Sequence, residues 1–355
     1  MGILVFIIIL AVLVLIHELG HFLAAKRNGV LVEEFGFGFP PRLFGIKKGE
    51  TIYSINLIPF GGFVKLYGEE YHEEKDPGKT LRDRAFIYKK PWQKAEIIVA
   101  GIVGNFLLAW VLISFLFTQG VPTPTNKVII DNVQRGSPAY VAGIQVGDQI
   151  TKVKTTNDSF TISSSEQLIK ISKEFGGKPI DLAVIRNGKG KLVTVVPRKD
   201  PPKGQGPLGV MITSFVEKKY PWYEAPFFGL AHSFDISIKI LTELSKTIFQ
   251  LVSFKQPSVD VAGPIGIAQF TGQAIKFGKN AVLELLALLS LNLAVINILP
   301  FPALDGGRLA FVVYEWTTKK RVNKTVERYV NLFGIIVLLS LALVISIRDV
   351  TRLLN

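Results

Sequence analysis

The chain has 355 residues, of which 48% are apolar and 19% are charged. Soluble domains carry about a quarter charged residues, so this balance indicates a membrane protein. The absence of cysteine excludes a disulfide framework and thiolate metal sites, so any metal must be held by His, Asp or Glu. Lys and Arg outnumber Asp and Glu by 41 to 28, a net charge of +13 that indicates either nucleic acid or cytoplasmic loops beside anionic lipid.

The first predicted element is a membrane-spanning helix at the N-terminus. Residues 2–16 include no charged or strongly polar side chain, and apolar residues resume at 22–25 before Lys26 and Arg27. A helix over this stretch is roughly 34 Å long, enough to cross a bilayer. A cleaved signal peptide is the alternative, and it fits poorly because the apolar run is long and no basic residue precedes it.

Three further stretches have spanning length, at about residues 95–117, 281–299 and 330–347. The stretch 222–254 is also long, but its charged residues recur at helical spacing along one face: Asp235, Lys239, Glu243 and Lys246. This pattern predicts an amphipathic helix that lies on the membrane or under a soluble domain. We therefore expect four spans.

The distribution of basic residues predicts the topology. They gather between the first two spans and between the last two, and the N-terminus has none. The positive-inside bias places both loops in the cytoplasm, and the two termini and the long middle segment outside it. Because the charge is spread over loops that also contain Glu, we expect membrane lipid as a partner and no nucleic acid.

The first span contains the pattern HExxH, formed by His17, Glu18 and His21. Four helical residues advance about 400°, so both imidazoles lie on one face and can hold one zinc ion. Glu18 lies beside them and can take a proton from an attacking water. The alternative is a buried structural pair, but polar side chains in a span cost several kcal/mol and are retained there mostly for function. His72 and His232 are expected to be surface or structural residues.

A catalytic zinc needs a third protein ligand, and no further His lies near the motif. The acidic candidates are Glu96, Glu284 and Asp305. Membrane depth favours Asp305, because the third span runs inward and reaches the depth of the histidines at its C-terminal end. Pro300 and Pro302 end that helix and leave irregular backbone that can aim the carboxylate. An ordinary turn at the helix exit is the alternative for Asp305.

These residues match a known family. HExxH on a first span, with the later run from Asn297 through Pro300 and Pro302 to Asp305, resembles the site-2 protease family of intramembrane zinc metalloproteases, in its bacterial, PDZ-containing type. Residues 101–106 resemble its second-helix motif, and residues 263–267 its G-P-I segment. The resemblance implies zinc on His17, His21 and Asp305.

The resemblance also implies roles for other residues. Glu18 would be the base, and Asn297 would contact substrate or stabilise the oxyanion. Gly36, Phe37 and Gly38 resemble the family's G-x-G in a membrane-reentrant β-hairpin. The implied substrate-binding residues are Gly36, Phe37, Gly38, Asn297, Pro300 and Pro302.

The middle segment, residues 126–216, is predicted to be a small soluble domain. Ser137, Pro138 and Gly143 fit the N-cap, first turn and C-cap of a short helix, and Asn187-Gly188 fits a two-residue hairpin turn. The run from Gly136 through Asp148 resembles a bacterial PDZ domain. By that likeness the peptide-binding loop is Leu208, Gly209 and Val210.

The expected fold is a polytopic α-helical membrane protein with four transmembrane helices, a membrane-reentrant β-hairpin and one inserted PDZ-like β/α domain. Its parts are residues 1–125, 126–216, 217–270 and 271–355. Residues 31–66 are expected to form the hairpin, whose strand edge can pair with an unwound substrate. A loop that only plugs the helix bundle is the alternative.

The leading function is zinc-dependent hydrolysis of single-span membrane proteins already trimmed outside a bacterial inner membrane, such as anti-sigma factors or remnant signal peptides. The active site would lie near the cytoplasmic side, with the PDZ-like domain limiting access from the other side. Two alternatives are a membrane protease acting on soluble peptide ends and a PDZ scaffold with a structural metal. The sequence leaves the oligomeric state open.

Overall fold

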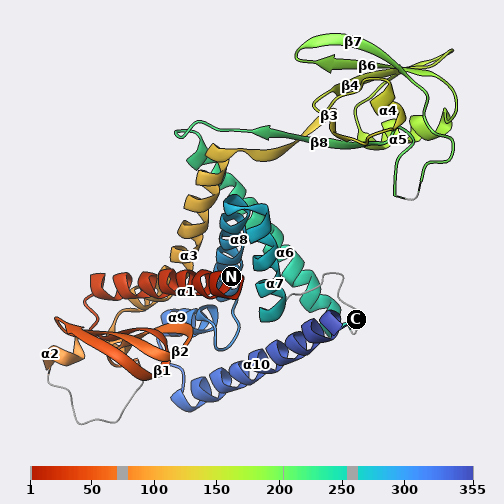
Figure 1. The fold of residues 1–355 in the computed structure, drawn as a ribbon. Coiled ribbons are helices and arrows are strands. Elements are labelled where there is room, and N and C mark those ends of the chain that lie inside the picture. Colours follow the sequence, from red (N-terminus) through yellow and green to blue (C-terminus); the bar gives the residue numbers. More distant parts are fainter. Residues whose placement is uncertain (1, 70–78, 203, 254–262, 355) are drawn as a thin grey trace. The chain divides into compact units, whose positions relative to one another are not determined.

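The structure is a computed structural model that describes residues 2–69, 79–202, 204–253 and 263–354. Contacts divide the chain into two compact units, drawn in Figure 1. The helical unit comprises Met1–Thr118 and Pro221–Asn355, and the β unit comprises Gln119–Tyr220. The β unit is wider than the predicted range 126–216, because residues 121–124 pair with residues 215–218.

The long helices of the helical unit match the predicted spans. Within the described residues, four helices are long and apolar enough to cross a membrane. They are α1 (Gly2–Arg27), α3 (Pro91–Gln119), α8 (Lys279–Ile298) and α10 (Lys324–Leu354). The prediction of four spanning helices is confirmed in length and composition.

The other helices are shorter or more polar. They are α2 (Lys79–Arg82), the 3-10 turn η1 (Phe86–Tyr88), α6 (Ala225–Val252), α7 (Pro264–Phe277) and α9 (Asp305–Thr318). On α6, exposed ion pairs join Lys239 to Asp235 and Lys246 to Glu243. This helix occupies most of the predicted amphipathic stretch, whose last residue, Phe254, lies outside the described residues, as does His72.

Two long strands, β1 (Val32–Lys48) and β2 (Thr51–Leu66), form the predicted hairpin around a turn at Gly49, where φ is +65°. Their pairing is doubled, since Phe35 pairs with both Tyr53 and Val64, and Tyr53 also pairs with Ile46. Each strand therefore folds back on itself and forms two segments. The four segments lie side by side in the order 42–48, 51–56, 32–37 and 62–66. The outer segment 62–66 begins beside α1.

Glycines let α1 and α3 approach closely. A Cβ on Gly104 would lie 2.9 Å from the carbonyl oxygen of Ile16, and one on Gly20 would overlap the backbone of Ala100. Since no side chain separates the two backbones at these positions, the middle of α3 lies directly against the HExxH turn of α1.

The β unit is a sheet with strand order β7-β6-β4-β3-β8, with β5 paired to β4. Its elements are β3 (Val121–Val133), α4 (Pro138–Val141), β4 (Gln149–Lys154), β5 (Ser159–Thr161), α5 (Ser165–Glu174), β6 (Ile180–Arg186), β7 (Lys189–Val195) and β8 (Val210–Lys218). The Ser137 side chain caps α4 by accepting from the Tyr140 backbone N–H at 3.2 Å. Asn187 and Gly188 join β6 to β7 with φ of +50° and +77°, as predicted for this hairpin.

Candidate metal centre

Two histidines of α1 face one point. The Nε2 atoms of His17 and His21 lie 3.1 Å apart, and the rings meet edge to face with centroids 4.7 Å apart. The Nδ1–H of His21 donates to the carbonyl oxygen of Ile97 on α3 at 2.8 Å. This hydrogen bond leaves the His21 Nε2 lone pair directed toward the shared point.

Asp305 reaches the same point from the other end of the chain. Helix α8 ends at Ile298, Pro300 and Pro302 interrupt helical backbone, and α9 begins at Asp305. The Oδ2 atom of Asp305 lies 3.0 Å from His17 Nε2 and 3.3 Å from His21 Nε2. Within the described residues, this is the cluster of three groups with metal-ligand spacing.

The donor set fits zinc. Bonds of about 2.0–2.1 Å in tetrahedral geometry separate ligand atoms by roughly 3.3 Å, close to the separations of these three atoms. Asp305 Oδ2 is buried and accepts no hydrogen bond from the part of the chain that the structure describes. Lone pairs at such distances repel one another unless a proton or a cation lies between them, and two imidazoles with one carboxylate leave the fourth zinc position open.

A cavity of about 150 Å³ adjoins the cluster. It is lined by Val14, His17, Glu18, Gly61, Gly62, Asn105, Leu293 and Asn297. Glu18 and Asn297, both predicted from the sequence as site residues, thus line the same cavity as His17, a candidate metal ligand. The cavity can therefore hold a water and a peptide group beside an acid and an amide.

Other predicted residues lie elsewhere. Gly36, Phe37 and Gly38 lie on β1 and pair with β2 or contact it, one strand from the cavity. Pro300 and Pro302 shape the turn before Asp305 and do not line the cavity.

The predicted peptide-binding loop belongs to the β unit. The Leu208 carbonyl accepts from the Ala139 N–H at 3.1 Å, and the Gly209 carbonyl accepts from the Gln134 N–H at 3.0 Å. These bonds hold the loop against the start of α4, while Val210 begins β8 and pairs with Val133.

Several cavity residues were missed by the sequence analysis. Gly61 and Gly62 of β2 line the cavity, and Gly62 approaches α1, where a built Cβ would lie 2.9 Å from Val14 Cγ1 and 3.2 Å from Glu18 Cγ. The Gly-Gly pair within the predicted hairpin was the available signal, since glycine inside a strand often marks close backbone approach. Asn105 was noted only as part of a family motif.

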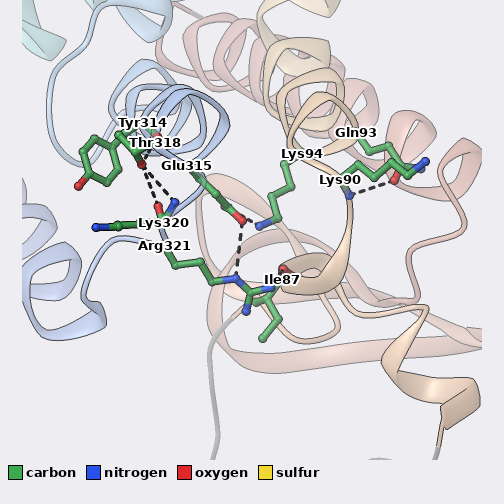
Figure 2. A network of polar contacts seen from close by, with 9 residues as sticks. All are labelled: Ile87, Lys90, Gln93, Lys94, Tyr314, Glu315, Thr318, Lys320 and Arg321. Atoms are coloured by element: carbon green, nitrogen blue, oxygen red, sulfur yellow. Dashed lines mark hydrogen bonds and ion pairs between the residues drawn. The ribbon is translucent and has the colours of Figure 1, made fainter.

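Polar links attach α9, which begins with Asp305, to the rest of the helical unit. Lys94 Nζ of α3 lies 2.8 Å from Glu315 Oε2, and Arg321 Nε lies 3.6 Å from Glu315 Oε1. Figure 2 shows both side chains directed toward Glu315. Arg321 also donates to the Ile87 carbonyl at 3.2 Å. Near the start of the helix, Arg308 Nη1 lies 2.6 Å from Glu69 Oε1. The Lys94 side chain is 6% exposed and the Glu315 side chain 20%, so the Lys94 charge is buried within a partly buried pair.

Comparisons with known proteins assign the chain to a family. The profile of Peptidase family M50 matches residues 5–341. The whole chain is 33% identical to a protein of Clostridium acetobutylicum named as a zinc metalloprotease, covering 98% of it. It is 30% identical to the regulator of sigma-W protease RasP of Bacillus subtilis, over 98% of each chain. A solved PDZ domain of an SdrC-like protein from Listeria monocytogenes aligns with 26% of this chain and 94% of that domain, at 19% identity and a TM-score of 0.22. The chain therefore belongs to Peptidase family M50, the site-2 protease family, and is a multi-pass membrane zinc metalloprotease.

Proposed function

We propose that this protein hydrolyses peptide bonds within transmembrane segments of single-span proteins already trimmed outside the membrane. His17, His21 and Asp305 hold zinc, and Glu18 is the general base. The observation that carries the proposal is the convergence of Asp305 Oδ2 on both histidine Nε2 atoms, at 3.0 and 3.3 Å. A structural metal site would have no use for the adjoining cavity with its free carboxylate.

The chemistry follows from the residues around the cavity. Bound zinc supplies a Lewis acid that polarises the peptide carbonyl and makes water a stronger nucleophile at neutral pH. Glu18 accepts the proton from the attacking water and delivers it to the leaving amine. Asn297 lines the same cavity, and its amide N–H donates to the carbonyl oxygen as negative charge develops there.

The hairpin presents the substrate. A peptide bond in a helix is shielded because its carbonyl is already hydrogen-bonded, so the substrate must be extended before water attacks. Among the described residues, the β2 segment 62–66 pairs with β1 along one side, and Gly61 and Gly62 line the cavity at its start. An extended substrate adds to this edge by backbone hydrogen bonds, which place its peptide groups near Glu18.

In the proposed topology the protein lies in a bacterial inner membrane, with both termini and the β unit outside the cytoplasm. The β unit is PDZ-like and restricts access to substrates with short outer stubs. The name of the B. subtilis relative, a regulator of sigma-W protease, makes single-span anti-sigma factors the first substrates to test.

Three variants test the proposal in purified full-length protein with a model transmembrane substrate. Glu18→Gln should keep one zinc per chain and lose about 10²–10⁴-fold in cleavage rate, because the amide cannot accept the proton. Asp305→Ala should lose both zinc and activity. The control is Glu284→Gln, which alters another acid considered as a ligand and should retain both. Full zinc content in Asp305→Ala, or near wild-type cleavage by Glu18→Gln, would refute the assignment.

A further inference from the structure

Asn105 of α3 is fully buried beside the candidate metal ligands His17, His21 and Asp305. Its side-chain Nδ2 is 3.4 Å from His17 Nδ1, and its Oδ1 is buried and accepts no hydrogen bond from the described residues. Its backbone carbonyl accepts from the Ser290 hydroxyl at 2.7 Å. A buried amide oxygen without a donor costs about 1–3 kcal/mol, so this arrangement calls for an explanation.

The neighbouring His21 shows the arrangement that a metal ligand needs. Its Nδ1–H donates to the Ile97 carbonyl, which leaves the Nε2 lone pair facing Asp305. If the Asn105 amide nitrogen donated to His17 Nδ1, the proton of a neutral imidazole would sit on Nε2. That nitrogen, 3.0 Å from Asp305 Oδ2, would then have no lone pair for a metal.

Rotation of the Asn105 amide by half a turn gives Oδ1 a donor and leaves His17 Nε2 free for a metal, and it moves the amide nitrogen to the position that Oδ1 held. The two ends of a carboxamide have nearly the same shape, and their assignment follows from the hydrogen bonds they can make. After the rotation Oδ1 accepts the Nδ1–H of His17 and gains the donor that it lacks. His17 then matches His21, with Nδ1 protonated and Nε2 free.

We propose that Asn105 is a positioning residue that accepts a hydrogen bond from His17 Nδ1–H and so directs the Nε2 lone pair at the metal. The inference rests on the proposed function, since it concerns the same zinc site. Partners of this kind orient most histidine ligands and set their proton position. The close α1–α3 packing at Gly104 holds the amide within reach of the ring.

Two substitutions at one position separate the direction of this hydrogen bond from simple packing. Asn105→Leu keeps the size and removes the acceptor, and it should weaken zinc binding about 10- to 100-fold. Asn105→Asp can only accept, so it should bind zinc about as tightly as the wild type. Zinc affinity is measured on the full chain in detergent by competition with a chromophoric chelator, with helicity from far-ultraviolet circular dichroism.

Ser290→Ala is the matched control, because it removes a buried hydroxyl that contacts Asn105 without touching the imidazole; its zinc affinity should be unchanged. The proposal is overturned if Asn105→Leu binds zinc as the wild type does, if folded Asn105→Asp binds as weakly as Asn105→Leu, or if Ser290→Ala loses as much. Failure of wild-type protein to bind zinc would instead refute the proposed function.

A second readout uses the unaltered protein and decides the question even if Asn105→Leu does not fold. The chain has only four histidines, so ¹⁵N-histidine labelling yields few resonances. In the zinc-loaded wild type, the Nδ1 proton of His17 should exchange with water as slowly as that of His21, because each is hydrogen-bonded to a buried acceptor. Much faster exchange of the His17 proton than of the His21 proton would overturn the inference.

Discussion

Gly101 of α3 lies where the two imidazoles need space. A Cβ built there would overlap the His21 ring at Nε2 and lie 2.9 Å from His17 Cε1. The residue therefore acts by having no side chain, because any larger residue would displace both rings from Asp305. The geometry of the cluster thus depends on a position that contributes no ligand.

Gly101→Ala is expected to lower zinc affinity by at least an order of magnitude, comparable with the loss of a ligand's supporting partner. Chelator competition on the full chain measures the change. Gly272→Ala is the control, since that glycine also lies in a helix but has nothing within 4 Å of a built Cβ. Equal zinc affinities of the two variants would contradict the prediction.

In the β unit, one buried carboxylate organises the loop between α4 and β4. Asp148 is fully buried and accepts from the Gln145 N–H at 2.9 Å and from Arg186 Nε at 2.7 Å. Burial alone raises the pKa of Asp148, but the bonds from Arg186 and Gln145 outweigh it and hold the pKa below its ordinary value. The ionised form therefore stabilises the fold.

Because the folded-state pKa is lowered, this stabilisation is complete above the ordinary pKa of Asp and is lost as the pH falls through the folded value. Arg186→Met should raise exchange of β4 and β6 amides at neutral pH by about tenfold or more, since a hydrogen bond to a charged group contributes about 1.5–3 kcal/mol. Hydrogen-exchange mass spectrometry on the full chain measures this. The difference in amide exchange rate between Arg186→Met and the wild type should shrink at acid pH. A difference that stays constant with pH would contradict the ion pair with Asp148 as the cause.

At the scale of elements, α9 determines where Asp305 lies. The helix begins at that residue and is attached through Glu315 to Lys94 and through Arg308 to Glu69. Breaking a buried ion pair by removing one partner leaves the other charge without compensation. Loss of Glu315 should therefore lower the stability of the helical unit and also disturb the position of Asp305, which lies about three turns away on the same helix.

Glu315→Gln is expected to destabilise the helical unit by about 3 kcal/mol and to weaken zinc binding, because Lys94 is left buried without a countercharge. Thermal unfolding and chelator competition measure the two effects. Asp235→Asn is the control, since its pair with Lys239 is 55% and 70% exposed and should contribute less than about 1 kcal/mol. Adding Lys94→Met to Glu315→Gln should recover part of the loss, and a double variant no better than the single one would contradict the explanation.

At the scale of the whole molecule, the β unit is an insertion whose ends meet. Val121 of β3 pairs with Lys218 of β8, so the chain enters and leaves the unit at neighbouring positions. A short Gly/Ser linker can therefore replace residues 121–218 with little strain on the flanking helices α3 and α6. This makes the proposed access role of the β unit testable without loss of the proposed catalytic residues, which all lie in the helical unit.

The deletion variant should cleave a pre-trimmed substrate at nearly the wild-type rate and gain cleavage of an untrimmed one. The reason is that, in the proposed topology, the β unit lies outside the cytoplasm while the scissile bond lies near the other face, so that the unit can act only on access. Cleavage assays of both substrates with both enzymes measure the effect. Loss of activity on the short substrate, in a deletion variant that still binds zinc, would show that the unit helps to assemble the active site.

The sequence by itself determined the features that depend on neighbouring residues. The spacing of His17 and His21 follows from the helical repeat, the Ser137 cap and the Asn187-Gly188 turn follow from local backbone preferences, and the four spans follow from apolar length. Asp305 was a candidate despite its distance along the chain. The depth of a residue in the membrane can be counted along a spanning helix, and this count placed Asp305 at the depth of the two histidines.

Only the tertiary structure decided which faces of these elements meet. The doubled pairing of β1 and β2 brings Gly61 and Gly62 to the cavity and leaves Gly36 one strand away. Helix rotation places Asn105 beside His17 and Lys94 beside Glu315. Strand register and helix rotation are set by contacts between residues far apart in the chain, and a single sequence carries no local signal for such contacts.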